Sequence, residues 1–485
     1  MIDREAVRSN AKYLRQVRPI DPEEICAYID GQPHPAVVKQ TLRQESFDLG
    51  LVEREDGTFV PVDSGPVEYN QWTPEAFPEP YSFALEDQLV ERYGANWHRG
   101  ESGRELRASI TGLKEDYFAG SEVEYDETAA FGYAIYHLPD YYAAVGYVLG
   151  TLSERGLLPR TLRVLDVGAG SGGPALGLHD YLFGDQSTEF DPEAALVDYH
   201  AVEPSASADV LEPMLAETSR NFRPTVHRTT IEAYLTDRNE EATAPFDLIC
   251  FGNVLSELDD PVSVVDASLG LLADDGTILA LEPADLETAT GLRAIEREIA
   301  PPERDVTIYA PTLRLWEGNA PDDRGWSFDV RPELSVPAFQ DRLAEAAAEA
   351  GEDDPDAFRN VDVQFAYSLL RRDGERRYPF RASRERHAKM ATMDDHVTER
   401  IDLLAVKLSG DLSDGDNAVF KIGDGSQTTD HYAVLTQESA LNRALAGAEY
   451  GAVLAIENAL VLWNDDEAAY NLVVDGETIV DRLSG

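Results

Sequence analysis

The stretch "RVLDVGAGSGGPALGL", residues 163–178, passes from an apolar run through four glycines into a sequence that favours a helix. Further apolar runs of strand length follow it and alternate with helical patterns up to about residue 373. Strands separated by helices predict an α/β fold in which a mainly parallel, Rossmann-like sheet is wound on both faces. The predicted strands are "RVLDVG", "DYHAVEP", "PTVHRTTI", "FDLICFG", "GTILALEP" and "VQFAYSLLRR".

The glycines of the quoted turn fit two cofactor classes. Gly168, Gly170 and Gly173 have the G-x-G-x-x-G spacing of a dinucleotide-binding turn. With Gly172 in place of Gly173, the spacing becomes the G-x-G-x-G of a methyltransferase turn. A turn that serves packing alone is the third possibility. The glycines by themselves leave all three open.

Two acidic residues lie near this turn, and one of them, Asp166, favours one cofactor class. Asp166 lies two residues before Gly168, where a carboxylate would repel a pyrophosphate at the helix N-terminus. S-adenosylmethionine carries an ammonium and a sulfonium group and no phosphate, so a carboxylate suits it. Glu203 ends the next predicted strand, where it can accept hydrogen bonds from ribose hydroxyls in either class. We therefore predict an S-adenosylmethionine site formed by Asp166, Gly168, Ala169, Gly170, Ser171, Gly172, Glu203, Pro204 and Asn253.

Asn253 and Glu257 are the candidate catalytic residues. They follow the strand "FDLICFG", at the carboxyl end of the sheet where ligands usually bind. Asn253 could accept a hydrogen bond from an exocyclic base nitrogen, and Glu257 could shape the pocket or simply cap the helix that opens there. The sequence "GNVLSE" is not the Asn-Pro-Pro-aromatic signature of amino-methyltransferases of nucleic acids. We interpret His137 and His179 as ordinary helix residues.

The chain is strongly acidic. It has 91 Asp and Glu against 41 Lys and Arg, a formal net charge of −50, and six of its 41 basic residues are lysines. An acid-rich, lysine-poor chain is typical of a protein that works in concentrated salt, so we predict a halophilic host. The two cysteines lie far apart and predict no disulfide framework. With no apolar run of about 20 residues and no apolar N-terminal segment, we expect a cytoplasmic protein without a membrane partner.

One segment departs from this acidity. Residues 371–390, "RRDGERRYPFRASRERHAKM", hold seven Arg and one Lys against three acids. Arginine binds phosphate and stacks on bases, and aromatic rings offer stacking surfaces. A surface loop that neutralises nearby acids is the alternative. We predict RNA contacts, with no DNA partner, by Arg371, Arg372, Arg376, Arg377, Tyr378, Arg381, Arg384 and Arg386.

The two ends of the chain have patterns of their own. Three helical patterns precede two short strands around Asp56-Gly57, the order of a winged helix. Four basic residues share one face of the first predicted helix: Arg4, Arg8, Lys12 and Arg15. This face either is solvated and pairs with acidic residues or binds phosphate. From about residue 396 the order strand, strand, strand, helix, strand, strand is that of an OB-fold barrel.

Several of these stretches together resemble a known family. The segments "YAIYHLPDYYAAVGYVL", "VLDVGAGSGG", "AVEPS", "FDLICFGNVLSEL" and "LALEPADLETATGLRAI" are similar to the methyltransferase-like proteins associated with the mitochondrial small ribosomal subunit and to their prokaryotic relatives. The resemblance covers about residues 125–410. It implies a class I S-adenosylmethionine-type fold that acts on, or docks to, small-subunit ribosomal RNA during ribosome assembly.

One departure from the family changes the metal prediction. The relatives commonly carry a cysteine cluster after the fifth strand, whereas "IYAPTLRLWEGNAPDDRGWSFDV" keeps Trp326 and Phe328 and has no cysteine. We therefore expect no iron–sulfur or zinc centre.

The resulting domain prediction has five parts. They are a winged-helix-like domain in residues 1–65, a linker or wrapping segment in 66–125, a methyltransferase-like domain with an N-terminal helical part in 126–373, a basic RNA-contact segment in 374–395 and an OB-fold-like β-barrel in 396–485. Three functions stay open: a methyltransferase of small-subunit ribosomal RNA, an assembly factor that binds cofactor and RNA without transfer, and a small-molecule methyltransferase.

Overall fold

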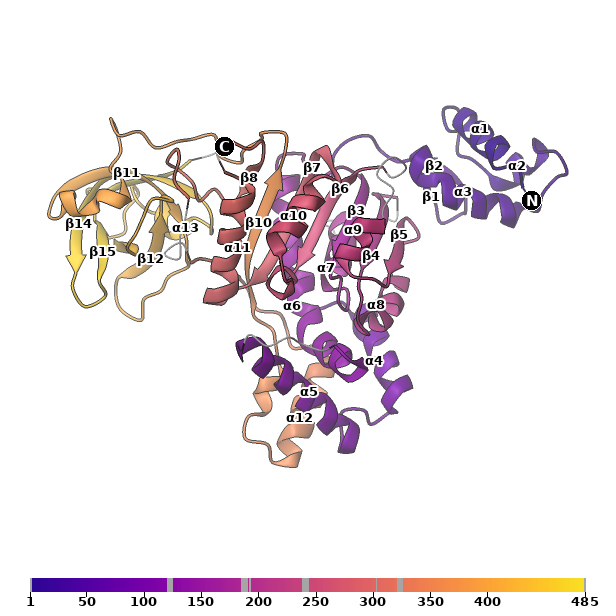
Figure 1. Ribbon diagram of the computed structural model, residues 1–485, viewed down its shortest axis with the longest axis horizontal. Coiled ribbons are helices and arrows are strands. Elements are labelled where there is room, and N and C mark those ends of the chain that lie inside the picture. Colours follow the sequence, from indigo (N-terminus) through magenta and orange to yellow (C-terminus); the bar gives the residue numbers. More distant parts are fainter. Residues whose placement is uncertain are drawn as a thin grey trace. The chain divides into compact units, whose positions relative to one another are not determined.

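The computed structural model describes residues 2–119, 125–184, 191, 193–237, 244–301, 303–320 and 326–483. The chain divides into two compact units, residues 1–250 with 333–362 and residues 251–332 with 363–485. Figure 1 labels the helices and strands of both units.

The central sheet has the predicted α/β character. Its strands are hydrogen bonded in the order β5-β4-β3-β6-β7-β10-β8, and β9 pairs with β10. Strands β3 and β4, and β4 and β5, run parallel, whereas β10 is antiparallel to β7, β8 and β9. The bounds are β3 (Thr161–Val167), β4 (Leu196–Val202), β5 (Phe222–His227), β6 (Phe246–Gly252), β7 (Leu272–Pro283), β8 (Thr307–Ala310), β9 (Asp329–Arg331) and β10 (Val363–Arg371).

All six predicted strands are present, and two short ones were missed. Strand β8 has four residues and β9 has three, too few for an alternating pattern to stand out in the sequence. The last long strand, β10, lies between β7 and β8, so the order departs from the 3-2-1-4-5-6 of a dinucleotide-binding sheet. This insertion already speaks against the G-x-G-x-x-G interpretation of the glycine turn.

The first unit holds most of the helices. They are α4 (Glu79–Tyr93), α5 (Gly100–Ala119), α6 (Glu127–Ser153), α7 (Gly173–Phe183), α8 (Ser207–Ala216), α9 (Ile231–Asp237) and α12 (Ala338–Ala350), with a 3-10 turn over Pro355–Phe358. The predicted linker or wrapping segment over 66–125 thus contains two helices, α4 and α5. Pro80 stands in the first turn of α4, where its missing N–H is not needed.

Helix α6 passes through Pro139 without ending. Proline cannot bond to the carbonyl four residues earlier, which is that of Ile135. Gln340 of α12 supplies the missing donor, because its Nε2 lies 2.8 Å from the Ile135 oxygen. Asn360 donates to the Tyr136 oxygen at 3.1 Å. A segment two hundred residues away thus completes the hydrogen bonding of α6, and the helix continues through Pro139.

The N-terminal part of this unit has the predicted order of elements. Helices α1 (Arg4–Leu14), α2 (Pro22–Ala27) and α3 (Pro35–Leu49) precede the hairpin of β1 (Leu51–Glu53) and β2 (Phe59–Pro61). Ile20 also forms a bridge with Phe59. A winged helix has this arrangement, although the name itself stays a prediction.

The basic face of α1 is directed at its own domain. Arg8 pairs with Glu45 at 2.5 Å and with Asp48 at 3.3 Å, both on α3. Arg4 donates to Gln44, and Arg15 donates to the Leu49 carbonyl. These contacts favour the interpretation of this face as one that pairs with acids.

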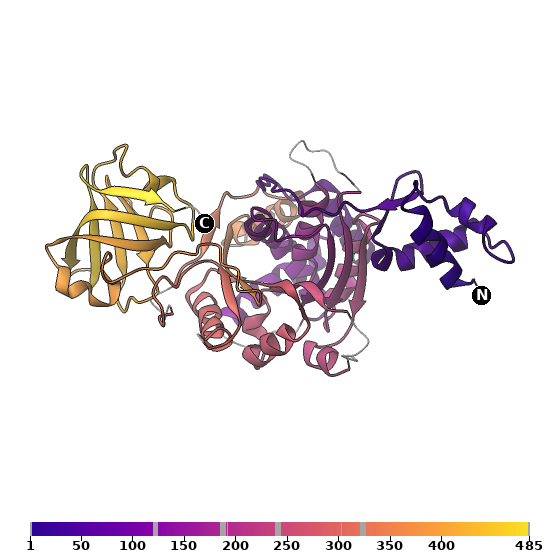
Figure 2. The same ribbon diagram turned by 90° about the horizontal axis from the view of Figure 1, so that it is seen from above.

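The second unit combines the antiparallel part of the sheet with a closed five-stranded barrel. The barrel follows the order β11-β12-β13-β15-β14 and closes through β11 and β14, while β16 pairs with β14. Its elements are β11 (Arg400–Lys407), β12 (Ala418–Gly423), β13 (His431–Leu435), α13 (Ala444–Gly447), β14 (Val453–Asn464), β15 (Ala469–Val474) and β16 (Ile479–Arg482). Figure 2 shows these strands, coloured orange to yellow.

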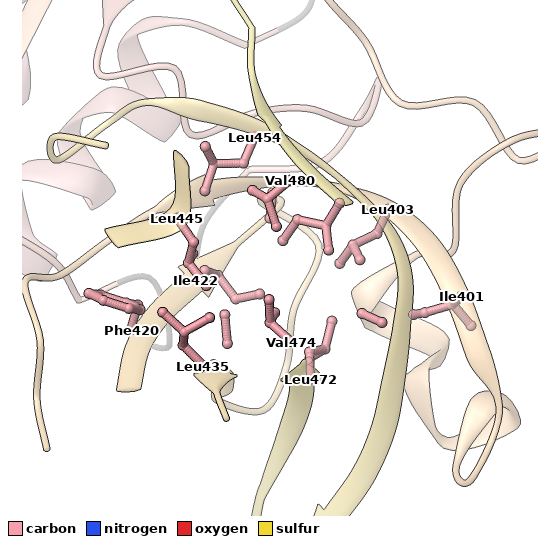
Figure 3. Packing of buried hydrophobic residues seen from close by; sticks show 14 of the residues in the cluster. Ile401, Leu403, Phe420, Ile422, Leu435, Leu445, Leu454, Leu472, Val474 and Val480 are labelled. Atoms are coloured by element: carbon pink, nitrogen blue, oxygen red, sulfur yellow. The ribbon is translucent and has the colours of Figure 1, made fainter. Parts of the chain in front are cut away.

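The barrel interior is a packed core. Figure 3 shows apolar side chains from every strand pointing inward, among them Ile422 and Leu472. The predicted order of three strands, a helix and two strands is present, and the short strand β16 follows it. The parallel pairing of β13 with β15, together with the pairing of β11 with β14, completes the barrel. The remaining elements of this unit are 3-10 turns over Leu255–Glu257 and Met390–His396 and helices α10 (Pro261–Leu269) and α11 (Leu286–Ile299).

Candidate cofactor site

The glycine turn between β3 and α7 needs its glycines for backbone reasons. Gly168, Gly170 and Gly172 have φ angles of 64°, 54° and 100°, in the region that side chains rarely adopt. At Gly172 a Cβ would also lie 2.7 Å from Leu211 Cδ1. The three glycines with positive φ angles are those of the G-x-G-x-G spacing.

Gly173 has a different role. It opens α7, and a Cβ there would come within 2.9 Å of Tyr141 Cβ and 3.3 Å of the Leu138 oxygen on α6. Its missing side chain therefore permits close packing of α7 against α6, rather than a special backbone conformation.

Glu203 fixes the turn from the neighbouring strand. Its Oε2 accepts a hydrogen bond from Gly170 N at 2.9 Å, and its Oε1 accepts from Ser205 N at 2.8 Å. Gly168 N donates to the Val202 oxygen at 2.9 Å. The carboxylate is buried and held in one orientation at the end of β4. Of the other predicted cofactor residues, Ala169 and Ser171 are buried in the turn, and Pro204 is exposed.

Asp166 is the least satisfied polar group of this turn. Its Oδ2 accepts a hydrogen bond from the Tyr199 hydroxyl. Its Oδ1 is buried and has no hydrogen-bond partner in the part of the chain that the structure describes. Burial raises the pKa of Asp166 to about 7, and the nearby Glu203 adds to the increase. A buried acceptor without a donor is costly, and a cationic ligand would satisfy it.

Asn253 lies in the second unit, at the end of β6. Its φ angle is 56°, and its backbone N donates to the Leu281 oxygen at 2.9 Å. Its Nδ2 is buried without a partner among the described residues. Glu257 is exposed in the turn that follows. The geometry keeps Asn253 as a candidate for ligand binding, and the catalytic roles of both residues stay predictions.

Glu282 is a buried acid of the second unit to which the sequence prediction gave no role. It lies near the end of β7 with 1% of its surface exposed, and its Oε1 accepts from Leu255 N at 3.0 Å. Burial raises the pKa of Glu282 to about 8. A glutamate at the carboxyl end of an otherwise apolar strand was the signal that could have identified it.

Two of the predicted RNA contacts lie in the interior. Arg371 is 1% exposed and binds Thr277 Oγ1 at 2.6 Å as well as Asp373. Tyr378 is 6% exposed in an apolar cluster with Leu315 and Val406. Both belong to the packing of the second unit, so their prediction as surface contacts is corrected. The exposed or half-exposed residues of the set are Arg372, Arg376, Arg377, Arg381, Arg384 and Arg386.

No group of three or more His, Cys, Asp or Glu within the described residues is arranged to hold a metal ion. None of the described helices is long and apolar enough to cross a membrane.

Three family models match separate parts of the chain. Residues 140–334 match a methyltransferase domain. The N-terminal domain of a family of unknown function, DUF8157, matches residues 4–55. The C-terminal domain of the same family matches residues 391–483. No curated protein matches the chain.

Solved methyltransferases are similar to the chain at low identity. Plantazolicin methyltransferase BamL, in complex with a triazolic desmethylPZN analog and SAH, is 11% identical with a TM-score of 0.29, over 60% of this chain and 98% of its own. Plantazolicin methyltransferase BpumL in complex with SAH is 12% identical with the same TM-score and coverage. A putative SAM-dependent methyltransferase from Streptococcus mutans is 10% identical with a TM-score of 0.25, over 43% of this chain and 44% of its own. Similarity this low says nothing about what this chain acts on.

The methyltransferase-domain match and the order of the sheet together give residues 140–334 the class I methyltransferase fold, whose cofactor is S-adenosylmethionine. The predicted fold class is confirmed.

Proposed function

We propose that this chain is an S-adenosylmethionine-dependent methyltransferase whose acceptor is the RNA of the small ribosomal subunit. The observation that carries the cofactor part is Asp166, a buried carboxylate with an unbonded oxygen, two residues before a turn of three glycines with positive φ angles. A site for pyrophosphate would present donors at this point and no carboxylate.

The residues of the turn fit this cofactor. Asp166 would attract its positive charge, and Glu203 has acceptor lone pairs left for ribose hydroxyls beside its bonds to Gly170 and Ser205. The glycines leave the backbone open to close approach. The bound cofactor would supply a methyl group on a positively charged sulfur, and these residues would bind and orient it.

The RNA part of the proposal is supported by charge. Residues 371–390 carry a net charge of +5 in a chain of net charge −50. Most of their arginines are exposed, whereas the α1 arginines pair within their own domain. Exposed arginines in a short segment favour phosphate binding. The resemblance to ribosome-associated proteins indicates the same partner.

A small-molecule acceptor is the second candidate. One observation in its favour is that Arg371 and Tyr378 are buried and therefore do not contact RNA at the surface. The other is the acidity of the barrel, because residues 396–485 contain 16 Asp and Glu against five Lys and Arg. An assembly factor that binds cofactor and RNA without transfer would use the same residues.

Incubation with radiolabelled S-adenosylmethionine and 30S subunits in concentrated KCl, followed by mapping of the label, tests the proposal. We expect label on one ribosomal RNA nucleotide. R381E/R384E should lose the subunit while keeping the cofactor, and D166N should do the reverse. Cofactor and subunit binding without label would identify an assembly factor. Cofactor binding without subunit binding would contradict the RNA part, and absence of cofactor binding would contradict the whole proposal.

A further inference from the structure

Helix α6 carries a row of rings on one face. Tyr133, His137 and Tyr141 follow each other at intervals of four residues, which places them on the same side of a helix. The rings of His137 and Tyr141 are stacked, with centroids 5.0 Å apart and an angle of 5° between their planes. The centroid of the Tyr133 ring lies 4.9 Å from that of His137 and 5.5 Å from that of Tyr125. All four rings are partly exposed, so this face is accessible from solvent.

This row of rings lies beside the glycine turn. A Cβ on Gly170 would be 3.7 Å from Tyr133 Cε1, and a Cβ on Gly173 would be 2.9 Å from Tyr141 Cβ. The Tyr133 ring therefore lies beside Gly170 of the turn on which the cofactor proposal rests, and Tyr141 Cβ lies beside Gly173, the first residue of α7. His137 stands between these two tyrosines on α6.

His137 is held in place by a carboxylate. Its Nδ1 lies 3.2 Å from Asp140 Oδ2, and Asn360 Nδ2 donates to the same oxygen at 2.9 Å. Tyr141 N donates to Asp140 Oδ1 at 2.9 Å. Asn360 is fixed in turn, because its backbone N donates to Gln340 Oε1 at 2.9 Å. The buried carboxylate thus has donors on both oxygens and faces the imidazole.

This arrangement determines what the imidazole can do. When Nδ1 donates its hydrogen to Asp140, Nε2 is the nitrogen that accepts a proton. The His137 side chain is 28% exposed, and its hydrogen bonds to other described residues are all at Nδ1. A partly exposed imidazole that a carboxylate orients through Nδ1 has the arrangement of a general base.

We propose that His137 takes the proton from the methyl acceptor and that the acceptor group is a hydroxyl on or beside a flat ring, which stacks along Tyr133 and Tyr141. A hydroxyl oxygen is a weak nucleophile until its proton leaves, so it needs such a base. As the oxygen–methyl bond forms, the carbon–sulfur bond breaks and its electron pair stays on sulfur. The hydroxyl proton goes to His137 Nε2. Asp140 is a positioning residue that orients the imidazole and stabilises the imidazolium, and Asn360 is a positioning residue that holds the Asp140 carboxylate in place.

The inference rests on the proposed function, because the base matters only if a methyl donor binds at the turn. The hydroxyl could be a ribose 2′-hydroxyl next to a base or the phenol of a small molecule. The chemistry at His137 is the same in both.

The test compares the donor with its demethylated product. In the full chain with ¹³Cε1-labelled histidines, the His137 resonance is assigned by its loss in H137Q. Its pH midpoint is then measured with saturating S-adenosylmethionine and with saturating S-adenosylhomocysteine. The first ligand has one more positive charge, on the sulfur. If His137 lies next to that sulfur, we expect its acid dissociation constant to be about threefold higher with the donor than with the product.

His387 of the second unit is the control, and its midpoint should be the same with both ligands. D140N should slow single-turnover transfer at unchanged donor affinity, because the imidazole loses the carboxylate that orients it. If both ligands bind by calorimetry and the His137 midpoint is unchanged between them, the inference is wrong while the proposed function stands. If neither binds, the proposed function fails first.

Two acceptor probes then separate the sources of the hydroxyl. Single-turnover transfer is measured to 30S subunits and to 7-hydroxycoumarin. H137Q should slow transfer to whichever probe accepts the methyl group by at least a hundredfold, with unchanged donor affinity. Equal transfer rates in H137Q and the wild type would contradict the inference.

Discussion

At the scale of single residues, Asp166 makes the cofactor site sensitive to pH. Its pKa is raised to about 7 by burial, so the group is largely neutral at pH 6 and largely ionised at pH 8. Only the ionised form attracts a cationic ligand. The site therefore changes its charge within the physiological range.

We expect the affinity for S-adenosylmethionine to increase about tenfold between pH 6 and pH 8, following the ionised fraction of Asp166. Isothermal titration calorimetry at several pH values measures this. D166N should bind more weakly and show no such increase. A pH-independent affinity in the wild type would show that Asp166 does not face the ligand charge.

Glu282 produces a pH effect on stability. Its pKa is about 8 in the fold and about 4.5 in an unfolded chain, so between these values the folded state holds a proton that the unfolded state has lost. The free energy of unfolding should therefore fall as the pH rises from 5 to 8. In E282Q this fall should be smaller, as measured by urea unfolding at both pH values. E287Q, an exposed residue of α11, should behave like the wild type.

The sequence revealed some of these residues and not others. Asp166, Glu203 and the glycines lie next to each other at two strand ends, so motif and position were enough. The carboxylate beside His137, Asp140, is three residues away, but the Asn360 amide that holds this carboxylate comes from a segment more than two hundred residues later, which no local pattern indicates. Arg371 and Tyr378 belong to a basic run in an acidic chain, a pattern that predicts a surface segment. Their burial depends on contacts with distant residues, Thr277 for Arg371 and Leu315 for Tyr378, which the local sequence does not indicate.

At the scale of elements, α6 depends on a distant segment. Gln340 is fully buried and forms hydrogen bonds with the Ile135 oxygen and with Asn360 N. Q340A would leave both groups unpaired and create a cavity, so we expect a loss of about 2–4 kcal/mol in the free energy of unfolding. Q364A, an exposed glutamine on β10, should change it by less than about 0.5 kcal/mol. Equal effects of the two variants would contradict the role given to Gln340.

The elements themselves were mostly predictable. Long strands with apolar runs, the glycine turn and the order of the barrel could be recognised from local patterns. Helices α4 and α5 were missed because their first turns contain residues typical of loops, and β8 and β9 because they are short. The pairing of β10 between β7 and β8 depends on tertiary contacts that no local pattern reports.

At the scale of the whole molecule, charge dominates. A net charge of −50 on 485 residues gives strong self-repulsion in dilute buffer. Salt reduces the screening length from about 10 Å at 0.1 M to about 3 Å at 1 M. The urea midpoint should therefore rise between 0.1 M and 2 M KCl, and tetramethylammonium chloride should have a similar effect if screening is the cause. Full stability in dilute buffer would contradict the prediction of a halophilic protein.

The discontinuous first unit has a consequence for how the chain matures. Residues 333–362 supply Gln340 and Asn360 to α6, which was made about two hundred residues earlier. During translation, α6 therefore emerges long before the side chains that complete its backbone bonding at Pro139. The first unit therefore cannot complete its folding until residues 251–332 of the second unit have been synthesised and residue 360 has left the exit tunnel.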